Sequence, residues 1–210
     1  MRKAAALGVC LCLATASLAV AGDPVPFEFS FTAEFDKKDS GAIPDTSVNF
    51  FPLIMNDPDI ESIVTLELLI SGLTHDSPWD LDIYLIDPRG VVGNPAFAVM
   101  LDRGDQEAVV GIDLLFSDLG LPLPPGTDGL CPGGECDNLN YLPEDGRGFN
   151  DAFGGLSGGM DAWILVIIDD SQGDEGSFDS FTLRGTAVPE PVTLSLLAVG
   201  AFAALRRRRS

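Results

Sequence analysis

Six aspartates are the residues of this chain with the clearest potential for chemistry, because they stand where strands are expected to begin or end. They are Asp80, Asp82, Asp118, Asp169, Asp170 and Asp174. In a β-sandwich such strand ends can converge at one rim, where carboxylates would supply the oxygen ligands that calcium prefers. We therefore predict that calcium (Ca²⁺) binds there, with a solvated acidic rim as the alternative. The Asp-x-Asp-x-Asp-Gly spacing of an EF-hand loop does not occur in the sequence.

His75 is the only histidine of the chain, and this limits the catalytic chemistry that can be expected. A serine or cysteine nucleophile needs a base within hydrogen-bond reach, and a lone histidine beside a strand is more often a structural residue. A pair of carboxylates that cleaves glycosidic bonds is the catalytic alternative, since the separation of two acids cannot be seen in a sequence. We predict that the protein is not an enzyme and has no catalytic residue.

The four cysteines indicate an oxidising compartment. Cys10 and Cys12 lie in an N-terminal segment that should be removed, so Cys131 and Cys136 remain. This pair is separated by Pro-Gly-Gly-Glu and is predicted to form a local disulfide, because an even number of cysteines in an exported protein usually pairs. A zinc site would need two more ligands, which a chain with one histidine does not readily supply.

The N-terminus has the order of a secretory signal peptide. Arg2 and Lys3 are followed by an apolar run over 7–18 and by a small-x-small tripeptide that begins with Ala19 and ends with Ala21. We predict a signal peptide over 1–21 that is cleaved after Ala21. An N-terminal membrane anchor is the alternative, but so short an apolar run does not span a hydrocarbon core of about 30 Å.

The C-terminal segment 187–210 combines three features in a fixed order. The first is a motif of four residues, Val188, Pro189, Glu190 and Pro191. An apolar stretch over 192–205 follows it, and its beginning is marked by prolines that discourage helix across the motif. The chain then ends with a basic cluster made of Arg206, Arg207, Arg208 and Arg209. Four arginines are costly to translocate, so they should stay on the cytoplasmic side of a membrane.

This order of motif, apolar stretch and arginines resembles the PEP-CTERM sorting signal of biofilm-forming or polysaccharide-producing Gram-negative bacteria. The resemblance implies that an exosortase cleaves the chain near the motif, after transient anchoring of the tail in the inner membrane. A plain C-terminal transmembrane helix is the alternative, although the apolar stretch is short for a permanent span. We therefore expect an exported protein of the outer surface or the extracellular matrix.

The part between the two terminal segments is strongly acidic. The ends hold six of the 12 lysines and arginines but only one of the 32 aspartates and glutamates, which leaves six bases against 31 acids and a net charge of about −25. Such a surface repels nucleic acid, which is excluded as a partner. It also attracts cations, because crowded carboxylates raise one another's pKa unless a cation lies between them.

Alternating apolar and polar residues predict strands over 27–31, 64–68 and 81–85. Further strands are predicted over 96–101, 163–168 and 178–183. A region rich in glycine, proline and aspartate over 119–159 should be mostly loop, and no amphipathic helix is evident. Many short strands with glycine-rich turns predict an all-β domain, an antiparallel β-sandwich or jelly roll.

The segment 73–90 contains, in order, His75, Asp80-Leu81, the alternation over 83–85 and Pro88-Arg89-Gly90. This order has a resemblance to the P domain (P/Homo B) that follows the catalytic domain of kexin-like and furin-like subtilases. It continues downstream in Trp163, Asp174-Glu175-Gly176 and the strand over 178–183, with Phe116-Ser117-Asp118 as the middle strand. It departs from the family at the insertion around the cysteine pair and at Met160-Asp161-Ala162.

The resemblance covers residues 60–186, and the preceding segment 22–59 is expected to add N-terminal strands to the same β domain. P domains are β jelly rolls that accompany a protease, and some bind calcium. We therefore expect a non-catalytic surface or biofilm-matrix protein that passes signal peptidase and exosortase during maturation. The alternative is an accessory module that binds carbohydrate, such as extracellular polysaccharide, or docks to a separate subtilisin-like protease.

Overall fold

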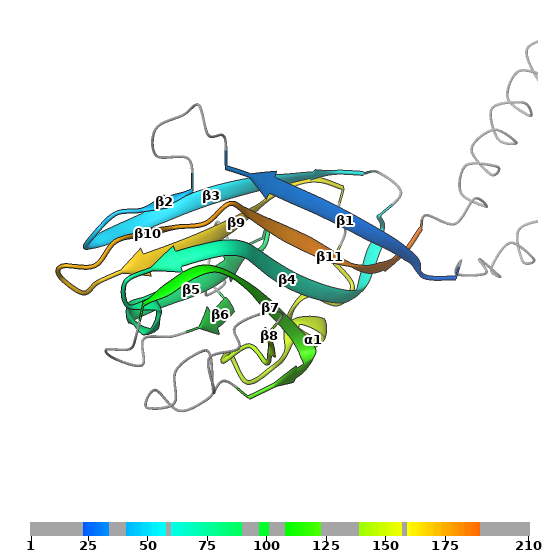
Figure 1. Ribbon diagram of the computed structural model, residues 1–210. Coiled ribbons are helices and arrows are strands. Elements are labelled where there is room, and N and C mark those ends of the chain that lie inside the picture. The colour runs from blue at the N-terminus through cyan, green and yellow to red at the C-terminus, as the bar shows by residue number, and fades with distance from the viewer. Residues whose placement is uncertain are drawn as a thin grey trace, which may run out of the picture.

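Two β-sheets pack face to face in the part of the chain that the computed structural model describes (Figure 1). The described residues are 23–33, 41–57, 60–89, 97–100, 108–122, 139–156 and 159–189. The larger sheet has seven strands: β1 (Val25–Thr32), β2 (Ala42–Ile43), β4 (Ser62–His75), β7 (Val109–Leu121), β8 (Leu139–Tyr141), β10 (Gly176–Ser177) and β11 (Ser180–Val188). The smaller sheet has four: β3 (Ser47–Asn56), β5 (Leu81–Ile86), β6 (Phe97–Met100) and β9 (Gly159–Asp169).

The strand order shows that the beginning and the end of the domain are interleaved. β1 pairs with β11, which pairs with β4, and the other edge of β4 pairs with β7. The four-stranded sheet has the order β3-β9-β5-β6. All pairs are antiparallel except β7 with β8. The all-β sandwich predicted from the sequence is therefore confirmed, and the segment expected to add N-terminal strands supplies β1 and β2 to the larger sheet and β3 to the smaller one.

The core lies between the sheets and is filled by the inward positions of alternating strands. Leu81, Ile83 and Leu85 of β5 are fully buried, as are Trp163 and Leu165 of β9. Aromatic rings add contacts across the sheets. The ring of Phe51 meets that of Phe178 edge-on at 4.7 Å, and Trp163 meets Phe153 at 5.1 Å.

The loop predicted over 119–159 contains more structure than expected. Its described part includes the end of β7, which runs on to Leu121, the short strand β8 and the helix α1 (Phe149–Phe153). Phe149 and Phe153 of α1 are buried against the core. A single 3₁₀ turn, η1 (Pro78–Asp80), precedes β5. The expectation that Asp118 ends its strand is thus wrong, because β7 continues for three residues beyond it.

Several predictions concern residues outside the described ranges. They include the cleavage residues Ala19 and Ala21, the pair Cys131 and Cys136, and the tail from Glu190 and Pro191 to Arg206, Arg207, Arg208 and Arg209. The beginning of the sorting motif is described: Val188 is the last residue of β11, and its carbonyl accepts a hydrogen bond from the Glu61 N–H at 3.2 Å. Within the described residues, no helix is long and apolar enough to cross a membrane.

Candidate functional site

One end of the sandwich gathers a buried histidine and three carboxyl groups. His75 is the last residue of β4, Asp80 ends η1, Asp169 is the last residue of β9, and Asp174 lies in the loop between β9 and β10. The register explains this convergence, because Asp169 pairs directly with Leu81, the residue after Asp80. Three of the six aspartates predicted as metal ligands therefore come close to one another, together with the histidine of the P-domain-like segment.

The imidazole of His75 is wholly enclosed. Its side chain is 0% exposed, and its Nδ1 accepts a hydrogen bond from the Ser77 N–H at 3.1 Å. Gly176 faces it on β10, and a Cβ at that position would lie 2.4 Å from His75 Cδ2, so only glycine leaves room for the ring. An acceptor at Nδ1 places the proton of the neutral ring on Nε2, toward Asp169.

His75 Nε2 lies 3.4 Å from Asp169 Oδ2, and both side chains are fully buried. The distance is long for a hydrogen bond, and neither atom has a hydrogen-bond partner, so the contact is mainly electrostatic. Burial raises the pKa of the Asp169 carboxyl, and the adjacent imidazole opposes this rise. The Ser171 N–H donates to the other oxygen, Oδ1, at 3.2 Å.

Asp80 and Asp174 form the second half of this cluster. Asp80 is 2% exposed, and its Oδ2 has no hydrogen-bond partner. Desolvation raises the pKa of the Asp174 carboxyl, and the negative charge of Asp80 raises it further. Two carboxyl groups this close cannot both ionise without cost, so either a proton or a cation between them would stabilise the fold.

The other three aspartates lie elsewhere. Asp170 is exposed after the end of β9, and Asp82 accepts a hydrogen bond from the Tyr84 hydroxyl at 3.3 Å on the outside of β5. Asp118 lies on β7 nine residues beyond Val109, the partner of His75, and so roughly 25 Å away along the strand. Its carboxylate accepts the backbone N–H groups of Phe149 and Asn150, at 2.5 and 2.9 Å, at the start of α1. The structure does not bring the six together.

The cluster meets the requirements of a calcium site only in part. It offers unpaired carboxylate oxygens on Asp80 and Asp169, but a histidine nitrogen stands where calcium would need further oxygen ligands. Across the described ranges, no group of three or more histidine, cysteine, aspartate or glutamate side chains is arranged to hold a metal ion. Calcium binding therefore stays a prediction.

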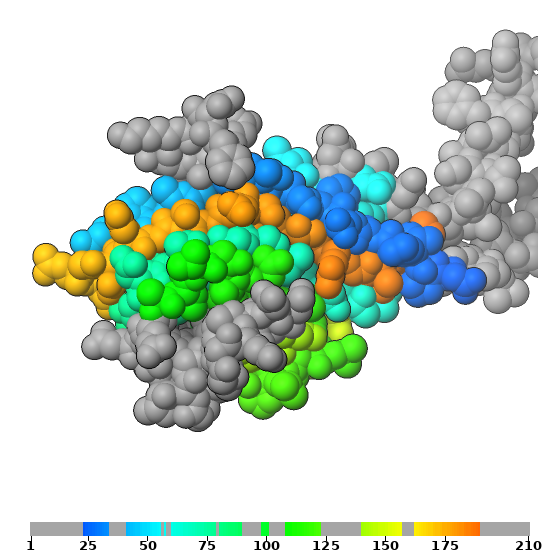
Figure 2. All heavy atoms as spheres, viewed as in Figure 1, coloured from blue at the N-terminus to red at the C-terminus, as the bar shows by residue number. Residues whose placement is uncertain are grey.

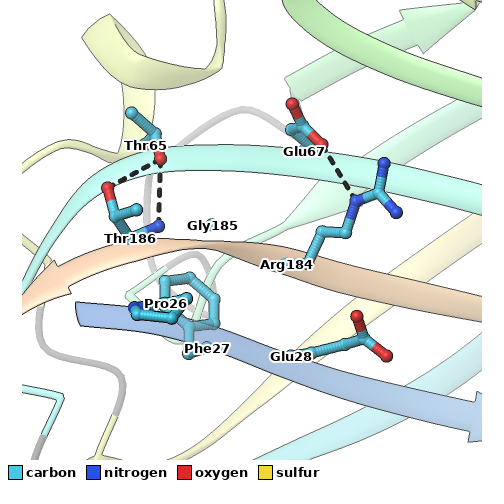
Figure 3. A pocket seen from close by; sticks show the side chains of 8 residues that line it. All are labelled: Pro26, Phe27, Glu28, Thr65, Glu67, Arg184, Gly185 and Thr186. Atoms are coloured by element: carbon cyan, nitrogen blue, oxygen red, sulfur yellow. Dashed lines mark hydrogen bonds and ion pairs between the residues drawn. The ribbon is translucent and has the colours of Figure 1, made fainter.

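The seven-stranded sheet turns its outer face toward the viewer in Figures 1 and 2, and this face carries a shallow hollow over β1, β11 and β4 (Figure 3). The hollow has a volume of about 430 Å³ and is lined by Pro26, Phe27, Glu28, Thr65, Glu67, Arg184, Gly185 and Thr186. Arg184 Nε donates to Glu67 Oε2 at 2.9 Å, and the Thr65 and Thr186 hydroxyl oxygens lie 2.9 Å apart. Hydroxyl, carboxylate and guanidinium groups of this kind can exchange hydrogen bonds with a polar ligand.

On the outer face of the four-stranded sheet, most outward positions are apolar, with Asp82 of β5 as an exception. We call this surface the apolar outer face. It consists of Val48, Phe50, Pro52 and Ile54 of β3, of Ala162, Ile164, Val166 and Ile168 of β9, and of Tyr84 and Ile86 of β5. Val48, Phe50 and Ile54 are 54%, 61% and 66% exposed. Sequence reasoning missed this surface, although the unbroken apolar run over 163–168 is typical of a strand covered on both sides.

A five-residue stretch, Gly155-Leu156-Ser157-Gly158-Gly159, has the Gly-x-Ser-x-Gly spacing of a nucleophile elbow. A nucleophile elbow connects a strand to a following helix, whereas this stretch connects the helix α1 to the strand β9. The wholly buried His75 pairs with Asp169 and is therefore not available as a base for it. The spacing alone gives no support to an esterase-like site.

The chain was compared with known proteins. No family model and no curated protein matches it. Among solved structures, the complex of the serine protease of Aeromonas sobria with its chaperone matches at 13% identity and a TM-score of 0.45, over 80% of this chain and 28% of that one. A structure of the serine protease of Aeromonas sobria matches at 15% identity and a TM-score of 0.45, over 79% and 27%. The chain thus spans little more than a quarter of the length of the solved chains that it matches.

Proposed function

We propose that this chain is a non-catalytic, exported binding module of the cell surface or biofilm matrix, built on a P-domain-like sandwich and sorted by an exosortase through a PEP-CTERM tail. The observation that carries the proposal is the apolar outer face. Contiguous exposed apolar surface on a soluble domain usually marks a site of interaction with a protein or a membrane. The strong acidity of the domain disfavours an anionic membrane, so we propose a protein partner.

A non-catalytic role agrees with the state of the only imidazole. His75 is fully buried between β10, Ser77 and Asp169, so it has no surface at which a substrate could meet it. Its contacts are those of a residue that holds strand ends together. A general base must lie within hydrogen-bond reach of the proton that it abstracts, and an enclosed ring does not.

The proposed sorting role of the tail agrees with where the fold ends. β11 ends at Val188, which pairs with Ser62 on β4. The Pro-Glu-Pro motif therefore follows the last strand directly, and cleavage there would remove the apolar stretch and the arginines without touching the sandwich. Pro189 cannot donate the next ladder hydrogen bond, so it is well placed to stop β11.

The test uses the full chain, expressed in a Gram-negative bacterium that carries an exosortase. Wild type should be processed and retained in the surface or matrix fraction. A Pro189→Ala, Glu190→Ala variant should accumulate unprocessed in the inner membrane. A Phe50→Ser, Ile54→Ser variant should be processed normally but shed into the medium, whereas Val110→Ser, at an 81% exposed valine of β7, should be retained like wild type. Equal retention of all processed variants would contradict a binding role for this face.

Carbohydrate binding is a second candidate function, and the hollow on the seven-stranded sheet favours it. Its hydroxyls and its Arg184–Glu67 ion pair are suited to sugar hydroxyls, and Phe27 adds an apolar floor beneath Gly185. On a glycan array, binding that Glu67→Gln abolishes and Val48→Ser leaves intact would establish this function. A subtilisin-like protease that co-purifies through the apolar outer face would instead establish the docking role that the P-domain resemblance implies.

A further inference from the structure

The hollow on the seven-stranded sheet is centred on β11, with β1 on one side and β4 on the other. The backbone of β11 is paired with both neighbours along the length of the hollow, so its N–H and C=O groups are used in the two ladders. A ligand over β11 therefore cannot bind as an added strand, which needs a free edge. It must be recognised by side chains.

A glycine gives the hollow its floor. A Cβ at Gly185 would collide with the Thr65 carbonyl oxygen and lie 3.1 Å from Phe27 Cζ. β11 and β4 thus approach each other closely here, and the Phe27 ring takes up the space beneath the glycine (Figure 3). The floor is therefore apolar, and polar side chains border it on two sides, at Thr186 and at Arg184.

A pair of threonine hydroxyls forms one border of the hollow. Their oxygens lie 2.9 Å apart, and Thr65 Oγ1 also accepts the Thr186 N–H at 2.9 Å. Only one of the two hydroxyl protons can lie between the oxygens, so the other remains free to donate to a ligand. The contact with the backbone fixes the position of the pair. This border therefore offers one O–H donor, together with oxygen lone pairs, at a defined place.

Three charged residues form the opposite border. Glu28, Arg184 and Glu67 are direct cross-strand neighbours on β1, β11 and β4, with Arg184 in the middle (Figure 3). Arg184 Nε donates to Glu67 Oε2 at 2.9 Å, which leaves the N–H groups of both Nη atoms for a ligand. Glu28 is exposed, and its carboxylate forms no hydrogen bond or ion pair with any other described residue. Two carboxylates against one guanidinium give this border an excess of one negative charge.

The two borders suit the hydroxyl groups of a sugar. A sugar hydroxyl both donates and accepts a hydrogen bond, so it can meet the threonine pair on one side and the Nη groups and carboxylates on the other. Thr186 and Arg184 are two residues apart on β11, so the borders are separated by roughly 7 Å. A single pyranose ring spans such a gap with its hydroxyls, while its C–H face lies on the Phe27 floor. The volume of about 430 Å³ leaves room for the ring.

The charge of the hollow separates neutral sugars from acidic ones. A ligand carboxylate that approached Arg184 would also lie close to Glu67 and Glu28, and the two repulsions outweigh the one attraction at similar distances. Arg184 is moreover already bonded to Glu67, so an anion would have to compete for it. Neutral hydroxyls meet neither obstacle.

We propose that this hollow binds a neutral sugar residue of a polysaccharide chain and discriminates against uronic acids and other anionic sugars. The inference rests on the carbohydrate-binding function given above as the second candidate and names the class of its ligand. It is independent of the apolar outer face, which lies on the other sheet. The threonine pair supplies the free hydroxyl donor, Arg184 supplies further N–H donors, and the two glutamates supply acceptors and the repulsion of anions.

The experiment uses the full chain on an array of oligosaccharides printed as matched pairs. Oligogalacturonate, oligomannuronate and oligoguluronate are each printed beside the same chain with its carboxyl groups reduced to alcohols, together with oligomers of glucose and mannose. Wild type should bind one or more neutral chains, and any reduced chain that binds should do so at least about fivefold more tightly than its uronate. Thr186→Val should weaken binding about three- to tenfold, whereas Thr182→Val, whose hydroxyl meets Ser30 outside the hollow, should not.

Charge variants test whether the hollow itself makes the choice. The whole domain is acidic and repels anions, so a matched change of charge is needed. Glu28→Lys turns the excess of one negative charge into one positive charge and should remove or reverse the preference for neutral sugars. Glu175→Lys makes the same change at an exposed residue near the far end of β4, roughly 25 Å from Glu67, and should leave the preference unchanged.

The outcomes separate this inference from the functions proposed above. Preference for uronates, or equal binding of both members of a pair, would overturn the inference, and carbohydrate binding would stand if Glu67→Gln abolishes it. A preference for neutral chains that Glu28→Lys leaves intact would also overturn it, because the charge of the hollow would not be its cause. Absence of binding to every printed chain would overturn both the inference and the carbohydrate function. The retention of Phe50→Ser, Ile54→Ser tests the apolar outer face separately.

Discussion

His75 Nε2 and Asp169 Oδ2 face each other at 3.4 Å inside the protein, at the junction of the last residue of β4 with the last residue of β9. These strands belong to different sheets, so the pair ties the two layers of the sandwich together at one end. A buried polar pair of this kind adds little net stability compared with apolar residues of the same size, but removing one partner is costly because the other stays buried without it. Replacing either residue alone should therefore destabilise the folded state.

The first prediction concerns the loss of one partner of this pair. His75→Ala should lower the free energy of unfolding by about 3–5 kcal/mol, because it leaves the Asp169 carboxyl buried without its neighbour. The control is Asp145→Asn, which weakens the pair with the half-exposed Arg147 guanidinium and should cost less than about 1 kcal/mol. Urea unfolding of the full chain measures both. A double variant, His75→Leu with Asp169→Leu, should recover much of the loss, and failure to recover would contradict an electrostatic origin.

The second prediction is that stability rises toward acidic pH. The pKa values of Asp169 and Asp174 are raised in the folded state, above about 3.9 in the unfolded chain. A proton therefore binds the folded state more tightly, and the stability it adds is fully present below the unfolded pKa and is lost as pH rises through the folded values. The urea midpoint should be higher near pH 4.5 than near pH 7.

A single variant identifies which carboxyl group causes this dependence of stability on pH. Asp174→Asn should raise stability at pH 7, because it removes a negative charge beside Asp80, and it should flatten the pH dependence. The pKa of Asp145 is lowered by its hydrogen bond to Arg147, so Asp145→Asn should leave the acidic rise in place. A midpoint that falls steadily from pH 7 to pH 4.5 in wild type would contradict the assignment.

The third prediction concerns Asp118. Its carboxylate accepts two backbone N–H groups at the start of α1, which buries Phe149 and Phe153. Asp118→Ala should cost about 1–3 kcal/mol, since it leaves those donors without their acceptor, and Asp118→Asn should cost less. Asp151→Ala, at an exposed residue in the same turn, is the control. Equal costs for Asp118→Ala and Asp151→Ala would mean that the cap contributes nothing.

The sequence predicted strands whose residues alternate and also the apolar run over 163–168, which is part of β9, but it missed β3. The strand β1 can be recognised from the sequence because Phe27, Phe29 and Phe31 alternate with polar residues. The strand β3 was not recognised, because the run from Phe50 to Ile54 is apolar on both faces and contains Pro52, which normally argues against a strand. The proline is tolerated because β3 is an edge strand. Because apolar residues occupy both faces of β3, the strand shows no alternation in the sequence. The same residues place apolar side chains on the apolar outer face.

The candidate site was predictable only in part, for a related reason. His75, Asp80 and Asp169 lie at strand and turn ends, so their approach could be anticipated from the idea that strand ends meet at a rim. Asp118 also stood in a strand pattern, but its partners are backbone groups 31 and 32 residues away, and no local pattern reveals such a contact. Strand direction and register decide which rim a residue reaches, and these emerge only from the packed sheets.

The last prediction tests calcium at the buried cluster. If calcium replaces the proton between Asp80 and Asp174, millimolar calcium should raise the melting temperature of the full chain above that in chelator, because a ligand of the folded state stabilises it by mass action. The rise should be larger at pH 7 than at pH 4.5, since protons compete for the same oxygens. Asp80→Asn should remove it, whereas Asp118→Asn should leave it unchanged, because Asp118 caps α1 at the other end of β7. A melting temperature that is the same in calcium and chelator, at both pH values, would show that the cluster does not hold calcium.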